Sequence, residues 1–173
     1  MQIHFWEILV VVCLLCPRPA GQALAAINLH QLAASAGYIF AGTVMAIERA
    51  PAVGPNEVET IRVTFRVDEG VRGVRSRQVL TIREWAGLWT AGERYRPGEH
   101  VVLMLYPPSH VGLTSPVGGA MGTFPLDRDG NLTAMGGQSE TLAHDPVVGP
   151  WLRGRSHASG RDFVRVLRRV AKE

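Results

Sequence analysis

Cysteine is nearly missing from this sequence: of 173 residues only Cys13 and Cys16 carry a thiol. Both lie in an N-terminal segment that we expect to be removed. The rest of the chain can therefore form no disulfide, hold no metal through thiolates and use no cysteine nucleophile. A domain of this length can still be stable without a disulfide, because 46% of the residues are apolar and can build a core.

Lysine and charge in general are also scarce. Lys172 is the only lysine, and charged residues make up 19% of the chain. So low a charged fraction argues against a long disordered tail. The arginines behind the formal charge of +3 are spread along the sequence without a basic block, so we expect no nucleic-acid partner.

A long hydrophobic run is the third absence. The longest apolar run, 8–16, has nine residues, whereas a membrane-spanning helix needs about 20. Its position before Pro17 and the small residues of Ala23-Leu24-Ala25 is typical of a cleaved signal peptide, although no basic residue precedes the run. We expect a signal peptide at 1–25, cleavage before Ala26, and a secreted or periplasmic mature chain without a stable membrane span. A buried N-terminal segment is the alternative.

Glycine (19) and proline (11) are plentiful, which favours many turns and short strands over long helices. The clearest pattern is the segment 61–68, where apolar and polar residues alternate and Phe65 falls on the buried face. Further strands are predicted at 38–47, 79–85, 101–106, 123–126 and 132–135. Gly42 predicts a bulge or a tight bend in the first of them, and Gly130 predicts the tight turn of a hairpin at 127–131.

Two helices complete the expected fold. Asn28, with Gln31 as its capping-box partner, begins a short helix that Gly37 ends, and Ser159 with Asp162 begins a final amphipathic helix. The residues 26–173 are thus predicted to form one domain of the mainly β class. We expect a small antiparallel OB-like β-barrel with a short N-terminal helix and a C-terminal amphipathic helix.

Four segments in this order resemble a known group of proteins: YIFAGTV at 38–44, VDEGVRG at 67–73, RPGE at 96–99 and VVLML at 101–105. Over 29–126 the chain is similar to exported bacterial proteins of unknown function whose barrel is like that of netrin-like domains and tissue inhibitors of metalloproteinases. The resemblance implies an OB-like barrel. It does not imply inhibition, since those inhibitors bind zinc through an N-terminal cysteine and this mature chain would begin with Ala26.

No catalytic constellation stands out in the sequence. A hydrolase could use Ser115, but Pro116 follows it directly and the nucleophile-elbow pattern is missing. A metal-dependent enzyme could use His144 and His157, but their spacing fits no standard zinc site. We expect no metal and no cofactor, and we expect Glu84 and the other acids near strand ends to be solvated.

Aromatic and arginine residues concentrate around the connection between the third and fourth predicted strands. The predicted binding residues are Trp85, Trp89, Arg94, Tyr95, Arg96 and Tyr106. Such side chains are enriched at binding hot spots, so the sequence favours a non-enzymatic exported module that binds a protein or peptide of the cell envelope. Within this set we expect Trp89 to be exposed and Trp85 to close the core. The alternative is that both rings fill one end of the barrel.

Overall fold

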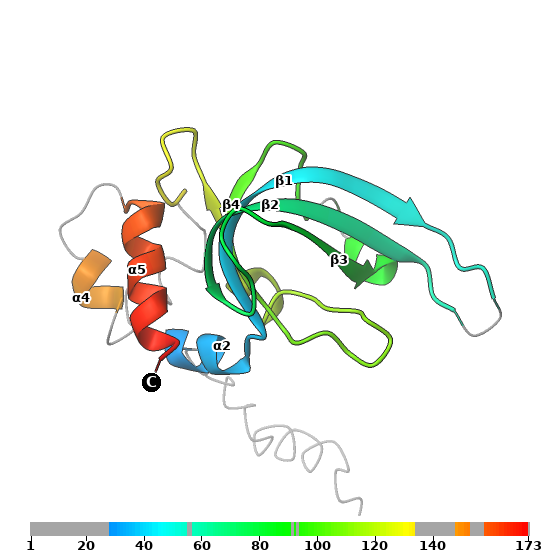
Figure 1. The fold of residues 1–173 in the computed structure, drawn as a ribbon, viewed down its shortest axis with the longest axis horizontal. Coiled ribbons are helices and arrows are strands. Elements are labelled where there is room, and N and C mark those ends of the chain that lie inside the picture. The colour runs from blue at the N-terminus through cyan, green and yellow to red at the C-terminus, as the bar shows by residue number, and fades with distance from the viewer. Residues whose placement is uncertain are drawn as a thin grey trace, which may run out of the picture.

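The structure is a computed structural model that describes residues 28–54, 57–90, 92, 94–133, 148–152 and 158–172. Its chain order is α2 (Leu29–Ser35), β1 (Tyr38–Ala50), β2 (Thr60–Arg72), β3 (Val79–Trp85), the 3₁₀ turn η2 (Ala86–Trp89), β4 (His100–Leu105), the 3₁₀ turn η3 (Gly119–Gly122), β5 (Thr123–Leu126), α4 (Val148–Leu152) and α5 (Gly160–Val170). The mainly β class and the two terminal helices are confirmed. Figure 1 shows the α-helices α2, α4 and α5 gathered on one side while β1 and β2 extend away from them.

The five strands form one antiparallel sheet in the order β3-β2-β1-β4-β5. The prediction of a closed barrel is wrong, because β3 and β5 remain the two edges of the described sheet. Loop segments occupy these edges instead. The amide of Thr114 donates to the carbonyl of Arg83 on β3 (2.9 Å), and the amide of Thr133 donates to the carbonyl of Pro125 on β5 (3.0 Å). An edge covered by a loop cannot pair with another strand at that point.

The strand β4 and the first half of β1, as far as Val44, bury both of their faces, which divides the core in two. One cluster lies inside the curl of the sheet and contains Phe65, Phe40 and Leu103. The other lies between the opposite face and the helices, where Ile39 and Met104 meet residues of α2 and α5. The α-helices thus cover one face of β1 and β4, while the outward face of β2 presents polar side chains to solvent.

Local signals explain most of the element boundaries. The side chain of Asn28 accepts the amide of Gln31 (2.8 Å), which begins α2 as predicted. The helix ends at Ser35 with Ala36 as its extended C-cap, so the chain leaves the helix at Gly37 as predicted, although Gly37 itself has no positive φ. Gly37 is needed for close approach, because a Cβ there would lie 2.6 Å from the Cα of Pro107.

Of the other local predictions, those at Gly42 and Gly130 are confirmed, whereas those at Ser159 and at 132–135 are confirmed only in part. A register shift at Gly42 confirms the bulge, and Gly130 has the positive φ (80°) that the hairpin requires. Ser159 does begin α5, but its side chain makes no capping hydrogen bond, so the predicted capping box is not formed. The predicted strand at 132–135 is reduced to a bridge between Leu132 and Leu126, and its part from 134 onward lies outside the described residues.

Arg72 connects the helices α2 and α5 to the sheet. From the end of β2, its guanidinium donates to the carbonyl of Ala33 in α2 and to that of Ala171 after α5. Both carbonyls belong to helix C-termini, where a cation compensates the negative end of the helix dipole. This arginine therefore fixes the helix layer against β1 and β2.

Candidate functional site

The exposed aromatic surface of the molecule centres on Trp85, the last residue of β3. Its side chain is 50% exposed, so the expectation that it closes the core is wrong. Alternation along β3 turns Glu84 inward and therefore turns Trp85 outward. Together with Leu88 and Tyr106, which are 39% and 40% exposed, Trp85 lines a shallow groove of about 290 Å³. We call this the aromatic groove.

Trp89 and Tyr95, in contrast, pack toward the core. Tyr95 is fully buried and makes edge-to-face contacts with Phe65 (5.6 Å between ring centroids) and with Trp89 (5.7 Å). Trp89 is half-buried against the same cluster. The exposed and buried roles expected for the two tryptophans are therefore reversed, because the η2 turn carries Trp89 back under the sheet.

A buried carboxylate explains why these two rings turn inward. Glu84 is fully buried, contrary to the solvated position expected from the sequence. Its Oε2 accepts the indole N–H of Trp89 (2.9 Å) and its Oε1 accepts the hydroxyl of Tyr95 (3.1 Å). The Nε of Arg94 lies 3.9 Å from Oε2 and supplies the compensating charge. A buried carboxylate is tolerated only with such partners.

Burial controls the ionisation of this cluster. It raises the pKa of Glu84 above its ordinary value of 4.5, against the opposing effects of the Arg94 charge and of the hydrogen bonds from Trp89 and Tyr95. Burial also raises the pKa of Tyr95, and the neighbouring Glu84 charge adds to this rise. All the polar atoms of the Glu84 carboxylate are used internally, so the cluster supports the fold rather than an incoming ligand.

The six predicted binding residues do not form one surface. Trp85 and Tyr106 share the aromatic groove, whereas Arg94, Tyr95 and Arg96 line a separate hollow of about 580 Å³ beside Pro125. Trp89 lines neither of them, and its indole donates to Glu84. Sequence proximity was a poor guide here because the connection after β3 folds across the end of the sheet.

The described residues show no catalytic arrangement for either of the two enzymatic alternatives. Ser115 takes part in the fold through its carbonyl, which accepts the amide of Tyr106 (3.0 Å). His144 and His157 lie outside the described residues. Among the residues that the structure describes, no group of three or more His, Cys, Asp or Glu side chains could hold a metal ion.

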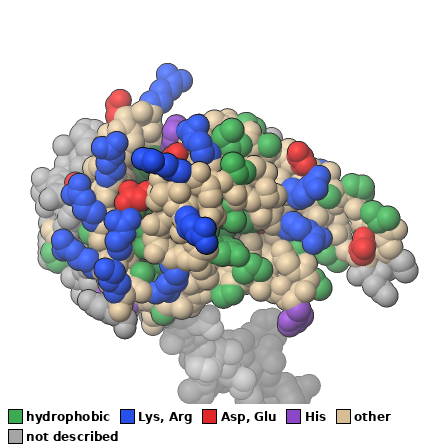
Figure 2. Space-filling model, in the orientation of Figure 1, with side chains coloured by type: hydrophobic (Ala, Val, Ile, Leu, Met, Phe, Trp, Pro, Cys, Tyr) green, Lys and Arg blue, Asp and Glu red, His purple; other side chains and the backbone are tan. Residues whose placement is uncertain are grey.

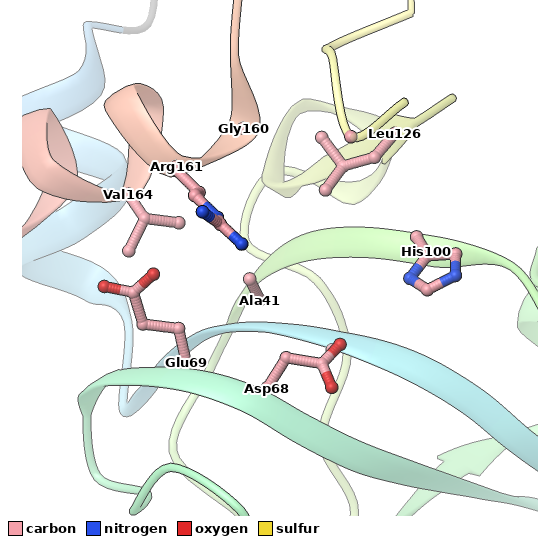
Figure 3. A pocket seen from close by; sticks show the side chains of 10 residues that line it. Ala41, Asp68, Glu69, His100, Leu126, Gly160, Arg161 and Val164 are labelled. Atoms are coloured by element: carbon pink, nitrogen blue, oxygen red, sulfur yellow. The ribbon is translucent and has the colours of Figure 1, made fainter. Parts of the chain in front are cut away.

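A polar network on the outward face of β1 and β2 was missed in the sequence. The hydroxyl of Thr43 on β1 donates to Oδ2 of Asp68 (3.1 Å) and contacts Nδ1 of His100 (3.2 Å), while Arg66 donates to the same hydroxyl (3.2 Å). Beside this network lies a cleft, into which Arg161 points from the first turn of α5 (Figure 3). The alternating pattern of β2 places Arg66 and Asp68 toward solvent, but their partners come from distant segments.

Comparison with protein-family models, curated proteins and solved structures finds no match to this chain. In the described part of the chain, none of the helices combines the length and the apolar character needed to cross a membrane. The fold itself defines the class: an antiparallel five-stranded sheet covered on one face by helices.

Proposed function

We propose that the chain is an exported, non-enzymatic binding module that takes an extended peptide segment of a protein in the cell envelope. The observation that carries this proposal is the aromatic groove, where a half-exposed tryptophan lies beside an exposed leucine and an exposed tyrosine. Contiguous large apolar side chains at a surface favour a partner. Tryptophan and tyrosine contribute the most binding energy per residue at interfaces.

The groove is held in shape before any partner arrives. A Cβ on Gly87 would lie 2.3 Å from the Trp85 ring, so the ring rests directly on the backbone at Gly87. The hydroxyl of Tyr106 accepts the amide of Gly118 (3.4 Å), which restrains the second ring. Side chains that are already ordered lose little entropy on binding. The groove therefore suits one apolar anchor residue of a peptide.

Polar groups around the groove favour a peptide over a purely apolar ligand. Ser109, Thr114 and Ser115 line its wall, and the guanidinium of Arg83 lies nearby, where it donates to the carbonyl of Val111 (3.4 Å). Such groups can pair with the backbone and with an acidic neighbour of the anchor residue. We thus propose a ligand segment with one large apolar residue flanked by an acidic one.

The proposal also includes export from the cell and a similarity to netrin-like domains. Signal-like features of 1–25 support a secreted or periplasmic location. The similarity to netrin-like domains is supported by the strand order β3-β2-β1-β4-β5, since an OB-type sheet is a five-stranded, partly open one. The kinship concerns the order of the strands only, because the seam between β3 and β5 is open.

The test selects peptides from a displayed random library on the wild-type domain and measures each selected peptide on three variants. Trp85→Ala and Tyr106→Ala should each weaken binding about tenfold or more, as hot-spot truncations do. Val53→Ala is the matched control, because Val53 is also exposed (88%) but lies in the β1–β2 loop. Its affinity should equal that of the wild type.

Gly87→Ala provides a second, independent variant. It keeps every ring but displaces Trp85 from its seat, so it should weaken the same peptides. Folding is checked by the melting temperature, which Trp85→Ala should hardly change. Peptides that bind Trp85→Ala and Tyr106→Ala as well as the wild type, or peptides without an apolar anchor, would refute the proposal.

A further inference from the structure

A cleft of about 460 Å³ lies where the first turn of α5 crosses the sheet, and it is lined by residues of β1, β2, β4, β5 and α5. A second hollow of about 480 Å³ shares His100, Leu126, Gly130 and Arg161 with it, so the two adjoin. Small-molecule sites have volumes of roughly 300–1,000 Å³. The cleft shares no lining residue with the aromatic groove.

One wall of the cleft is a saturated hydrogen-bond network. Thr43 can donate one hydrogen and accept two. Its hydrogen goes to Oδ2 of Asp68, because an ionised carboxylate can only accept, and Arg66 fills one of its acceptor positions. The remaining acceptor position faces Nδ1 of His100, so this nitrogen must carry a hydrogen. The hydroxyl is therefore not poised as a nucleophile, since the imidazole cannot remove its proton.

The acids of the cleft are already compensated. Asp68 receives the Thr43 hydroxyl on Oδ2 and the Nε of Arg66 on Oδ1 (3.2 Å). Glu69 receives Arg168 from α5 (2.8 Å). Neither carboxylate is therefore left to attract a cation on its own.

Arg161 carries a positive charge in the cleft that no acid of the described residues compensates. Its side chain points into the cleft between Glu69 and Ala41 (Figure 3), and it makes no hydrogen bond or ion pair within the described part of the chain. The remaining walls include the apolar side chains of Leu126 and Val164. The cleft thus combines one free guanidinium and an imidazole edge with an apolar lining.

We propose that this cleft binds a small ligand that carries a single carboxylate and a short apolar body. The guanidinium of Arg161 offers the planar fork that matches a carboxylate, and Leu126 and Val164 cover the apolar body. One free positive charge matches one negative charge. A dianion such as phosphate would bring a second negative charge that no free cation in the cleft can compensate, next to carboxylates that already use their own partners. This site is independent of the proposed peptide groove.

The charge around the cleft supports an anionic ligand. Figure 2 shows Lys and Arg side chains gathered over the end of the molecule that contains α5. This helix alone carries Arg161, Arg165, Arg168 and Arg169 against one acid, Asp162. A positive surface of this kind raises the local concentration of anions and steers them toward the cleft.

The test titrates the ¹⁵N-labelled domain with benzoate, with benzamide and with inorganic phosphate. Benzoate should produce saturable shifts of the amides of Gly42, Leu126 and Gly160, which line the cleft. Benzamide has the same shape without the charge and should bind about tenfold more weakly or not at all, as expected for the loss of a charged hydrogen bond. Phosphate should also be weaker than benzoate.

Variants connect these shifts to the cleft. Arg161→Gln should weaken benzoate about tenfold or more. Arg165→Gln is the matched control, because Arg165 lies on the same helix but pairs with Asp162 (2.7 Å) and does not line the cleft. Equal benzoate affinity in both variants, tighter binding of phosphate or benzamide, shifts located elsewhere, or no saturable shift at all would overturn the proposal. None of these outcomes affects the aromatic groove.

Discussion

Trp89→Phe tests whether the indole of Trp89 stabilises the buried carboxylate of Glu84. The change keeps a ring against Tyr95 but removes the indole N–H that donates to Oε2 of the buried Glu84 (2.9 Å). A hydrogen bond to a charged group contributes roughly 1.5–3 kcal/mol. Arg94 lies 3.9 Å from the same oxygen and can take over part of the compensation. We therefore expect a loss of about 2 kcal/mol in the free energy of unfolding.

Urea unfolding at neutral pH measures this loss directly, and thermal melts give an independent reading. In a chain of this size about 2 kcal/mol corresponds to a fall of roughly 4–8 °C in the melting temperature. Trp85→Phe is the matched control, because Trp85 is half-exposed and its indole has no hydrogen-bond partner in the described part of the chain. It should cost less than about 0.5 kcal/mol.

The pH dependence of this loss in stability gives a second measure of the same interaction. Because the Trp89 hydrogen bond lowers the pKa of Glu84, it favours the ionised carboxylate. The cost of Trp89→Phe should therefore shrink once the pH falls low enough to protonate Glu84. A loss in Trp89→Phe no larger than in Trp85→Phe, or a loss independent of pH, would refute the reasoning. It would mean that Trp89 does not hold the buried carboxylate.

Two further predictions concern the same core. Phe65→Ala should cost roughly 3–5 kcal/mol in urea unfolding, because Phe65 is fully buried between Phe40 and Tyr95; a loss below about 1 kcal/mol would contradict this packing. Glu84→Gln should flatten the pH profile of stability. The raised pKa of Glu84 makes the folded wild type bind more protons than the unfolded chain, so wild-type stability relative to the variant should fall as pH rises above 4.5. A stability difference between the wild type and Glu84→Gln that stays constant as the pH rises would contradict the raised pKa of Glu84.

The sequence was a good guide wherever a local pattern carries the structure. Alternation over 61–68 placed Phe65 in the core, and the side chain of Asn28 began the first helix as expected. The bulge at Gly42 and the hairpin turn at Gly130 followed from conformational demands that act within a few residues. These features depend on backbone geometry and on the period of a strand, both of which a single segment specifies.

Burial of polar groups could not be inferred in this way. Glu84 occupies an inward position of β3, and only the return of the chain through Trp89, Arg94 and Tyr95 supplies the partners that make its burial tolerable. The same return sends Trp89 inward and leaves Trp85 outward. Desolvation and its compensation depend on contacts between segments, so a sequence pattern alone could not assign the two tryptophans.

Closure of the sheet and the make-up of the cleft were likewise decided by tertiary structure. The sequence by itself determined the five strands of the sheet, the terminal helices and the mainly β class, although it also predicted a sixth strand at 132–135 that is reduced to a bridge. Whether β3 meets β5 depends on the loop at Thr114, which occupies the edge of β3 at Arg83. The cleft depends on His100 and Arg161, which lie 61 positions apart and meet because α5 packs on the sheet. Such meetings follow from long-range packing, for which no local sequence signal exists.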